Sequence, residues 1–218
     1  DWRSRGRTVA DFILLRLRAG EAGVYHVWDG LPRQLGLLGD QVACGNAFLD
    51  AYEVTGEADF LAHAQTQVRV IERQFHTSEG AFGDIDSMHD QTALLGERRV
   101  PLLENAEAAE LMIRLGHLTH DDRYPAAAYA VLGALAGGVT SAATDIEGVS
   151  ALARVTDRLL SLEPELKVIS FSRPTEHDSV GDPLHSEALR LALAAHTVQR
   201  LHPGFDDQLI SQLGVTGT

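Results

Sequence analysis

The chain has 218 residues and a formal net charge of −13, with 44% hydrophobic and 22% charged residues. These values are typical of a folded protein that can bury a sizeable apolar core in one or two domains. The acidic balance argues against a nucleic-acid-binding surface, which needs clustered lysine and arginine, so we expect small-molecule or protein partners.

Cysteine content and hydropathy give expectations about compartment. Cys44 is the only cysteine, so no disulfide can form within the chain and no CxxC redox or zinc motif exists; we expect a buried thiol in a helix. The first residues are polar and charged, without the apolar block of a signal peptide, and no apolar run approaches the ~20 residues of a membrane span. The sequence predicts a cytoplasmic protein that binds no membrane, and we expect no metal or cofactor.

Apolar spacing predicts a helical chain up to about residue 163. Five arginines stand in residues 1–18, where they are expected to form the solvated face of a first helix. The alternating segment 23–30, bracketed by glycines, predicts a short strand or hairpin arm, and residues 85–103 predict a long loop with a short helical turn near residues 93–95. Helices are expected over residues 8–17, 40–54, 58–75, 104–118, 123–136 and about 144–162.

The remainder of the chain has a different pattern. Leu166–Phe171 is a β-rich run and predicts one strand, whereas Leu184–Leu201 predicts a helix that ends before Pro203. We therefore expect a helical-hairpin domain over residues 1–163 and a small strand–helix element over residues 164–218.

One ten-residue pattern occurs twice. Residues 55–64 and 119–128 each begin with threonine, continue through a short polar turn and follow an apolar-periodic segment, and their starting points lie 64 residues apart. A period of this length with helices on both sides indicates a repeated helix–turn–helix unit. Because one unit cannot bury its own apolar face, the sequence predicts a mainly α fold in which antiparallel hairpins stack side by side.

Polar and aromatic side chains recur at the expected mouths of these hairpins. If these segments converge on one rim, flat rings could stack on a sugar while carboxylates and His26 move protons. Catalytic candidates are His26, Asp40 and Glu104, and substrate-binding candidates are Tyr25, Trp28, Phe82, Asp84 and Asn105. The alternative is structural, since Asp40, Glu104 and Asn105 also fit as helix N-caps and the aromatic rings as core.

An ordered series of short motifs resembles a known family. The series comprises residues 23–30, Gly36-Leu-Leu-Gly-Asp-Gln-Val-Ala43, Ala51–Gly56, Glu79-Gly-Ala-Phe-Gly-Asp84, Pro101-Leu-Leu-Glu-Asn-Ala106 and residues 114–124. It is similar to the C-terminal part of the DUF255 thioredoxin-domain-containing family, the relatives of spermatogenesis-associated protein 20. The resemblance covers roughly residues 8–200.

The resemblance implies that the hairpins form part of an (α/α)6 toroid, similar to N-acylglucosamine 2-epimerase and six-hairpin glycosidases. It also implies a thioredoxin-like domain before the toroid; the chain contains neither that domain nor its CxxC, so no redox role carries over. About half of the toroid's helices are absent, so we expect the missing N-terminal portion of a parent protein or a second copy as partner. The chain is then a scaffold or binding module, with half of a carbohydrate-active site as the alternative.

Overall fold

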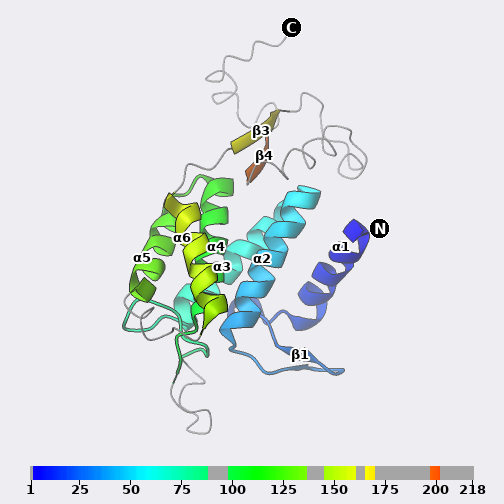
Figure 1. The fold of residues 1–218 in the computed structure, drawn as a ribbon. Coiled ribbons are helices and arrows are strands. Elements are labelled where there is room, and N and C mark those ends of the chain that lie inside the picture. The colour runs from blue at the N-terminus through cyan, green and yellow to red at the C-terminus, as the bar shows by residue number, and fades with distance from the viewer. Residues whose placement is uncertain (1, 88–97, 137–144, 161–164, 170–196, 202–218) are drawn as a thin grey trace. The chain divides into compact units, whose positions relative to one another are not determined.

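The structure is a computed structural model that describes residues 2–87, 98–136, 145–160, 165–169 and 197–201 (Figure 1). The chain divides into two compact units, one of residues 1–52 with 57–161 and one of residues 53–56 with 162–218. The helical turn that the sequence predicts near residues 93–95 lies outside the described residues.

Helices dominate the larger unit, so the predicted mainly α fold is confirmed. Its first part contains a short π-helical segment (Ile13–Leu17), a 3-10 turn (Gly20–Ala22) and a two-residue hairpin, β1 (Val27–Trp28) against β2 (Pro32–Arg33). The helices are α1 (Trp2–Phe12), α2 (Leu38–Thr55), α3 (Ala58–Gln74), α4 (Leu102–Thr119), α5 (Arg123–Ala136) and α6 (Ile146–Leu160). Among them no helix is long and apolar enough to cross a membrane.

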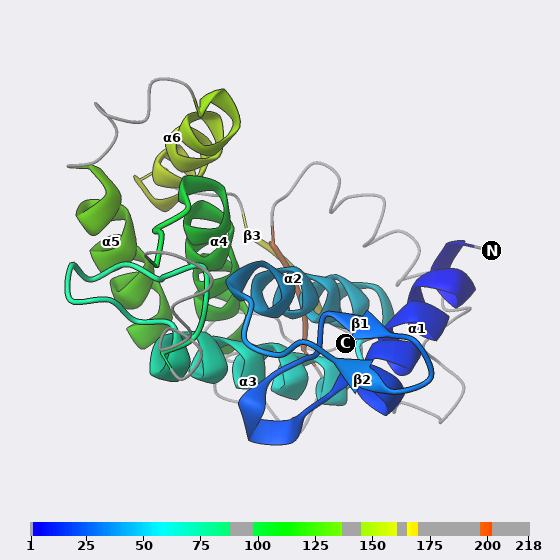
Figure 2. The same ribbon diagram turned by 90° about the horizontal axis from the view of Figure 1, so that it is seen from below.

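The helices alternate in direction along the chain. In Figure 1 α2, α4 and α6 run one way, and α1, α3 and α5 run the opposite way. Side-chain contacts agree for α1 and α3: Arg7 in α1 pairs with Glu57 just before α3, while Glu21, after α1, pairs with Arg73 in the last turn of α3. The described helices are therefore antiparallel hairpins stacked side by side (Figure 2).

Helix α4 is the centre of this unit. Eleven of its 18 residues are buried, on nearly all sides. Glycines allow the neighbouring helices to approach closely: a Cβ on Gly45 of α2 would collide with Leu111, and a Cβ on Gly148 of α6 would lie 2.6 Å from Leu102 Cβ. Since α4 has apolar partners on both sides, its sequence shows no single apolar stripe.

The 64-residue repeat appears as direct contact between equivalent positions. Arg114 of α4 donates to Asp50 of α2, the residue exactly one repeat earlier, at 2.6 Å, and also to Asn46 Oδ1 at 3.1 Å. The amide of Asn46 donates back to the carbonyl of Glu107 at 3.5 Å. The two hairpins thus pack in register, with equivalent faces of α2 and α4 side by side.

The smaller unit contains a two-stranded parallel sheet, which corrects one sequence prediction. β3 (Glu165–Ile169) pairs in parallel with β4 (Thr197–Leu201), with Glu165 opposite Thr197. The prediction of a helix over 184–201 is therefore wrong for residues 197–201; residues 184–196 lie outside the described residues. Parallel pairing joins segments far apart in sequence, so local periodicity does not reveal it.

Candidate functional site

Two of the three predicted catalytic residues, Asp40 and Glu104, stand in the first turns of α2 and α4. Both helices begin two residues earlier than expected, at Leu38 and Leu102, so Asp40 and Glu104 lie inside the first turn. The N-cap of α4 is Pro101, which makes no side-chain cap bond. The N-cap reading of these carboxylates is therefore wrong; inside the first turn they favour the helix through its dipole.

His26 and Asp40 are in contact. His26 Nδ1 lies 2.9 Å from one carboxylate oxygen of Asp40 and 3.1 Å from the other. The hairpin of β1 and β2 holds the ring there, because the His26 N–H donates to the carbonyl of Gln34 at 2.8 Å. A carboxylate that binds one ring nitrogen orients the imidazole and leaves the other nitrogen for proton transfer. The His26 side chain is 46% exposed and that of Asp40 22%.

Glu104 lies close to the same helix end. A Cβ built on Gly39, next to Asp40 in the chain, would lie 3.7 Å from Glu104 Cγ. The structure thus brings all three predicted catalytic residues to neighbouring helix starts, although only His26 and Asp40 share a hydrogen bond.

Asn105 has a structural role. It is fully buried, and its side chain binds both backbone groups of Phe82: Oδ1 accepts from the N–H and Nδ2 donates to the carbonyl, each at 2.8 Å. Nδ2 also donates to the carbonyl of Pro101 at 2.8 Å. With every polar atom of its amide engaged, Asn105 is neither an N-cap nor free to bind a substrate.

Gln41 makes the same arrangement one repeat earlier. Its Oε1 accepts from the Val24 N–H at 2.8 Å, and its Nε2 donates to the carbonyls of Val24 at 3.1 Å and Leu37 at 3.2 Å. We call these two residues the amide clamps, because each fixes a glycine-flanked segment onto the first turn of a helix. Sequence reasoning missed Gln41, yet a signal existed: Asp40-Gln41 and Glu104-Asn105 are acid–amide pairs at equivalent repeat positions.

Two further predicted ligand contacts are occupied within the protein. The Phe82 side chain is 2% exposed and packs edge-on against His76, with ring centroids 6.0 Å apart, so its face is not open to a sugar. Asp84 accepts from the Arg99 N–H at 2.9 Å through its carboxylate. The prediction that these side chains line a binding surface is wrong for Phe82, and Asp84 ties two loops together.

The remaining aromatic candidates lie on the hairpin. Trp28 is half-buried, and the guanidinium of Arg16 lies 5.2 Å from its ring centroid, a cation–π distance. Tyr25 is also half-buried, and its N–H donates to the carbonyl of Leu17 at 2.8 Å. One face of Trp28 is therefore covered by a side chain of the same unit.

The described residues form a groove elsewhere. An apolar groove of about 610 Å³ lies between α5 and α6, and none of the predicted site residues lines it. Among the described residues no group of three or more His, Cys, Asp or Glu side chains is arranged to hold a metal ion.

Cys44 follows Asp40 by one helical turn. Burial, with a smaller contribution from the Asp40 carboxylate, raises the pKa of the thiol to about 11. A thiol with this pKa stays protonated at neutral pH, so it lacks the activation of a nucleophile.

A search of protein-family models found no match to this chain, and a search of curated proteins found none either.

Proposed function

We propose that this chain is a helical-hairpin scaffold that binds a protein partner through the two ends of its helical stack. The observation that carries this proposal is the distribution of exposed large apolar side chains along the helices. Three lie near the start of the chain, Val9 and Phe12 on α1 and Leu15 on the π-helical segment that follows it, and three lie on the last two helices, α5 and α6 (Tyr129, Ile146 and Leu160). The other three among the described residues lie outside the helices, on the β1–β2 hairpin and in the loop before α4 (Val27, Leu31 and Val100). Exposed apolar side chains gathered in this way mark interaction surfaces.

The polar residues at the hairpin mouths support the same proposal. The side-chain amides of Gln41 and Asn105 are hydrogen-bonded to the backbone segments that they clamp, and the Asp84 carboxylate accepts a hydrogen bond from the loop before α4. These side chains therefore stabilise the repeat rather than await a ligand. The ordered motifs support a place for the chain in the DUF255 family, where the hairpins would form part of an (α/α)6 toroid and the partner would be the missing N-terminal portion or a second copy.

A carbohydrate-active half-site is the second candidate. It is favoured by one contact, the His26–Asp40 pair, because an oriented imidazole beside carboxylates is suited to acid–base chemistry on a sugar. Against it stand the burial of Phe82 and the absence of any of these residues from the groove.

A thermal-shift screen with neutral sugars and amino sugars separates the two candidates, because a ligand that binds only the native state raises its stability. The scaffold proposal predicts no rise in Tm at millimolar sugar. A sugar that stabilises the wild-type protein but not the variant His26→Gln would contradict it. Asp122→Asn, in the exposed turn between α4 and α5, is the matched control and should leave any sugar response unchanged.

A further inference from the structure

The exposed apolar side chains are concentrated in the first 31 residues of the chain. Among the described residues nine large apolar side chains are exposed, and five of them lie in this stretch: Val9, Phe12, Leu15, Val27 and Leu31. Two belong to α1, one to the π-helical segment after it, and two to β1 and its turn. A concentration of this kind marks an interaction surface, whereas apolar side chains that are exposed singly are ordinary.

Arg16 and Trp28 join the helical segment to the hairpin. The Arg16 guanidinium lies over the Trp28 ring, 5.2 Å from its centroid, and the Tyr25 N–H donates to the carbonyl of Leu17 at 2.8 Å. Figure 2 shows both strands of the hairpin beside α1. Because Arg16 follows Leu15 directly in the chain, the Trp28 ring lies at the edge of the exposed apolar row. We call this area the α1 surface; it consists of Val9, Phe12, Leu15, Arg16 and Trp28.

The charge around the α1 surface is opposite in sign to that of the whole chain. Residues 4–18 contain four arginines and one aspartate, whereas the chain carries a net charge of −13. Arg7 pairs with Asp11 and Glu57 within the same unit, so its charge is compensated locally. The first helical segment is therefore a basic surface on an acidic protein.

Two of these arginines share the face of the apolar row. Arg5 stands one helical turn before Val9, Arg16 follows Phe12 by four residues, and both arginines are exposed. A guanidinium that lies over an aromatic ring still donates from its edge, which is the geometry that a carboxylate accepts. A partner that fits this face therefore presents carboxylates next to apolar side chains.

The spacing of the row indicates that the complementary element is a helix. Val9, Phe12 and Leu15 recur every three residues, and such a ridge fits the groove between side-chain rows of a second helix. A membrane surface fits less well, because the arginines interrupt the apolar row instead of lying on the opposite side of the helix. Two α1 surfaces that face each other would bring their arginines together, so like charge opposes contact between two copies through this face.

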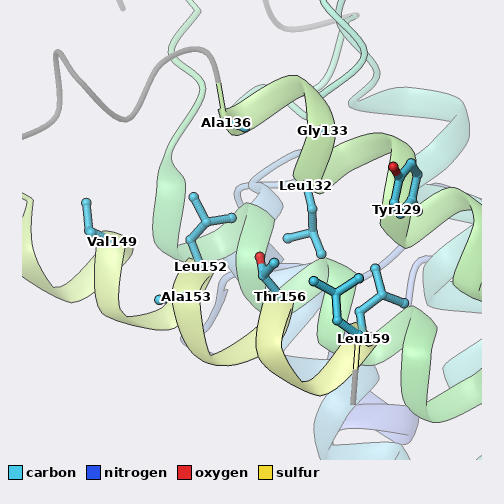
Figure 3. Close-up of a pocket in the computed structure, with 10 residues that line it drawn as sticks. Tyr129, Leu132, Gly133, Ala136, Val149, Leu152, Ala153, Thr156 and Leu159 are labelled. Atoms are coloured by element: carbon cyan, nitrogen blue, oxygen red, sulfur yellow. The ribbon is translucent and has the colours of Figure 1, made fainter. Parts of the chain in front are cut away.

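The apolar groove at the other end of the unit gives no such indication. Apart from the hydroxyl groups of Tyr129 and Thr156, the groove between α5 and α6 is lined by apolar residues and glycine, and by no charged side chain (Figure 3). Charge therefore defines the chemistry of a partner at the α1 surface and not at this groove.

We propose that the α1 surface binds an acidic amphipathic helix of a partner protein. The apolar side chains of the partner pack on Val9, Phe12 and Leu15, and one of its carboxylates accepts hydrogen bonds from Arg16. This inference rests on the proposed scaffold function and states the chemistry of its partner.

Selection on the full chain from a displayed library of helical peptides tests the proposal. The peptides carry leucine along one face, and their flanking positions vary among glutamate, glutamine and lysine. We expect glutamate to be enriched, and the enriched peptides to bind with micromolar dissociation constants that rise with salt concentration.

Variants of the α1 surface locate the binding site. Leu15→Glu places a carboxylate opposite those of the peptide, and Arg16→Gln removes the guanidinium, so each should raise the dissociation constant at least ~5-fold. Tyr129→Glu and Arg123→Gln are the matched controls, because both residues are exposed on α5, and they should leave the constant unchanged. Circular dichroism verifies that the variants fold.

Four outcomes would overturn the proposal. The first is enrichment of lysine or of no charge, and the second is binding that neither Leu15→Glu nor Arg16→Gln weakens. The third is that the protein binds vesicles of phosphatidylcholine and phosphatidylserine, or forms a dimer, and loses this in Leu15→Glu; the occupant is then a membrane or a second copy. The fourth is a selection that enriches no peptide, which would leave the scaffold proposal itself to the sugar screen.

Discussion

Replacing the buried amide of Asn105 is the perturbation with the largest expected effect on stability. The variant Asn105→Leu keeps the size of the side chain and removes its three hydrogen bonds, to the N–H and carbonyl of Phe82 and the carbonyl of Pro101. Asn105 is fully buried and Phe82 is 2% exposed, so water cannot replace these bonds without opening the core.

The cost follows from the groups left unpaired. A buried backbone group without a partner costs about 1–3 kcal/mol, and this variant orphans the N–H and the carbonyl of Phe82. The leucine side chain recovers part of this through apolar burial, so we expect a net loss of about 2–4 kcal/mol, a large fraction of the ~5–15 kcal/mol of a typical domain.

Urea denaturation followed by circular dichroism measures this loss. Gln41→Leu, the equivalent variant one repeat earlier, should lose a similar amount. Asn46→Ala is the control: its amide donates through longer bonds, of 3.3 and 3.5 Å, accepts one bond from Arg114 at 3.1 Å and is only half-buried. Water can reach the groups that this variant leaves, so it should lose clearly less than Asn105→Leu. A loss below 1 kcal/mol for Asn105→Leu would refute the reasoning.

Three further predictions concern charge, backbone and the thiol. Burial opposes ionisation of Glu110, but Arg154 and Arg158 pair with its carboxylate and hold its pKa below the usual value. The contribution of this carboxylate to stability is therefore present above about pH 4.5 and is lost as the pH falls through the lowered pKa. Glu110→Gln should cost about 1–2 kcal/mol at pH 7 and flatten the acid limb of a stability–pH curve. Gly23→Ala should cost about 2 kcal/mol or more in urea melts, because Gly23 has φ of +99° and a Cβ would collide with the clamping amide, whereas Gly6→Ala, with open space around it, should cost nothing. Cys44, with a pKa raised to about 11, should react with a thiol reagent at pH 8 at least ~100-fold more slowly in the folded protein than in urea.

The helices could be predicted because their apolar residues repeat locally. The expected and observed bounds of α5 agree, and those of α3 differ by one residue, since Phe60, Val68 and Ile71 mark its buried face. The starts of α2 and α4 were predicted two residues late. The prediction relied on capping by Asp40 and Glu104. In the structure Leu102 is buried in the first turn of α4, so the helix begins directly after Pro101.

The amide clamps could not be predicted from local pattern. Asn105 binds Phe82, 23 residues away, and Gln41 binds Val24, 17 residues away, so their role depends on tertiary contact. The sequence correctly placed Asp40 and Glu104 at equivalent positions. We did not predict that the next residue in each copy, Gln41 or Asn105, is a buried amide whose hydrogen bonds hold the preceding segment against the first turn of the helix.

Amide hydrogen exchange at Val24 and Phe82 tests most directly the claim that the two hairpins are equivalent units held by buried amides. We predict slow exchange at both sites in the wild-type protein, with Gln41→Leu accelerating exchange mainly at Val24 and Asn105→Leu mainly at Phe82. Rapid exchange at both sites in the wild-type protein, or identical patterns in the two variants, would contradict the account.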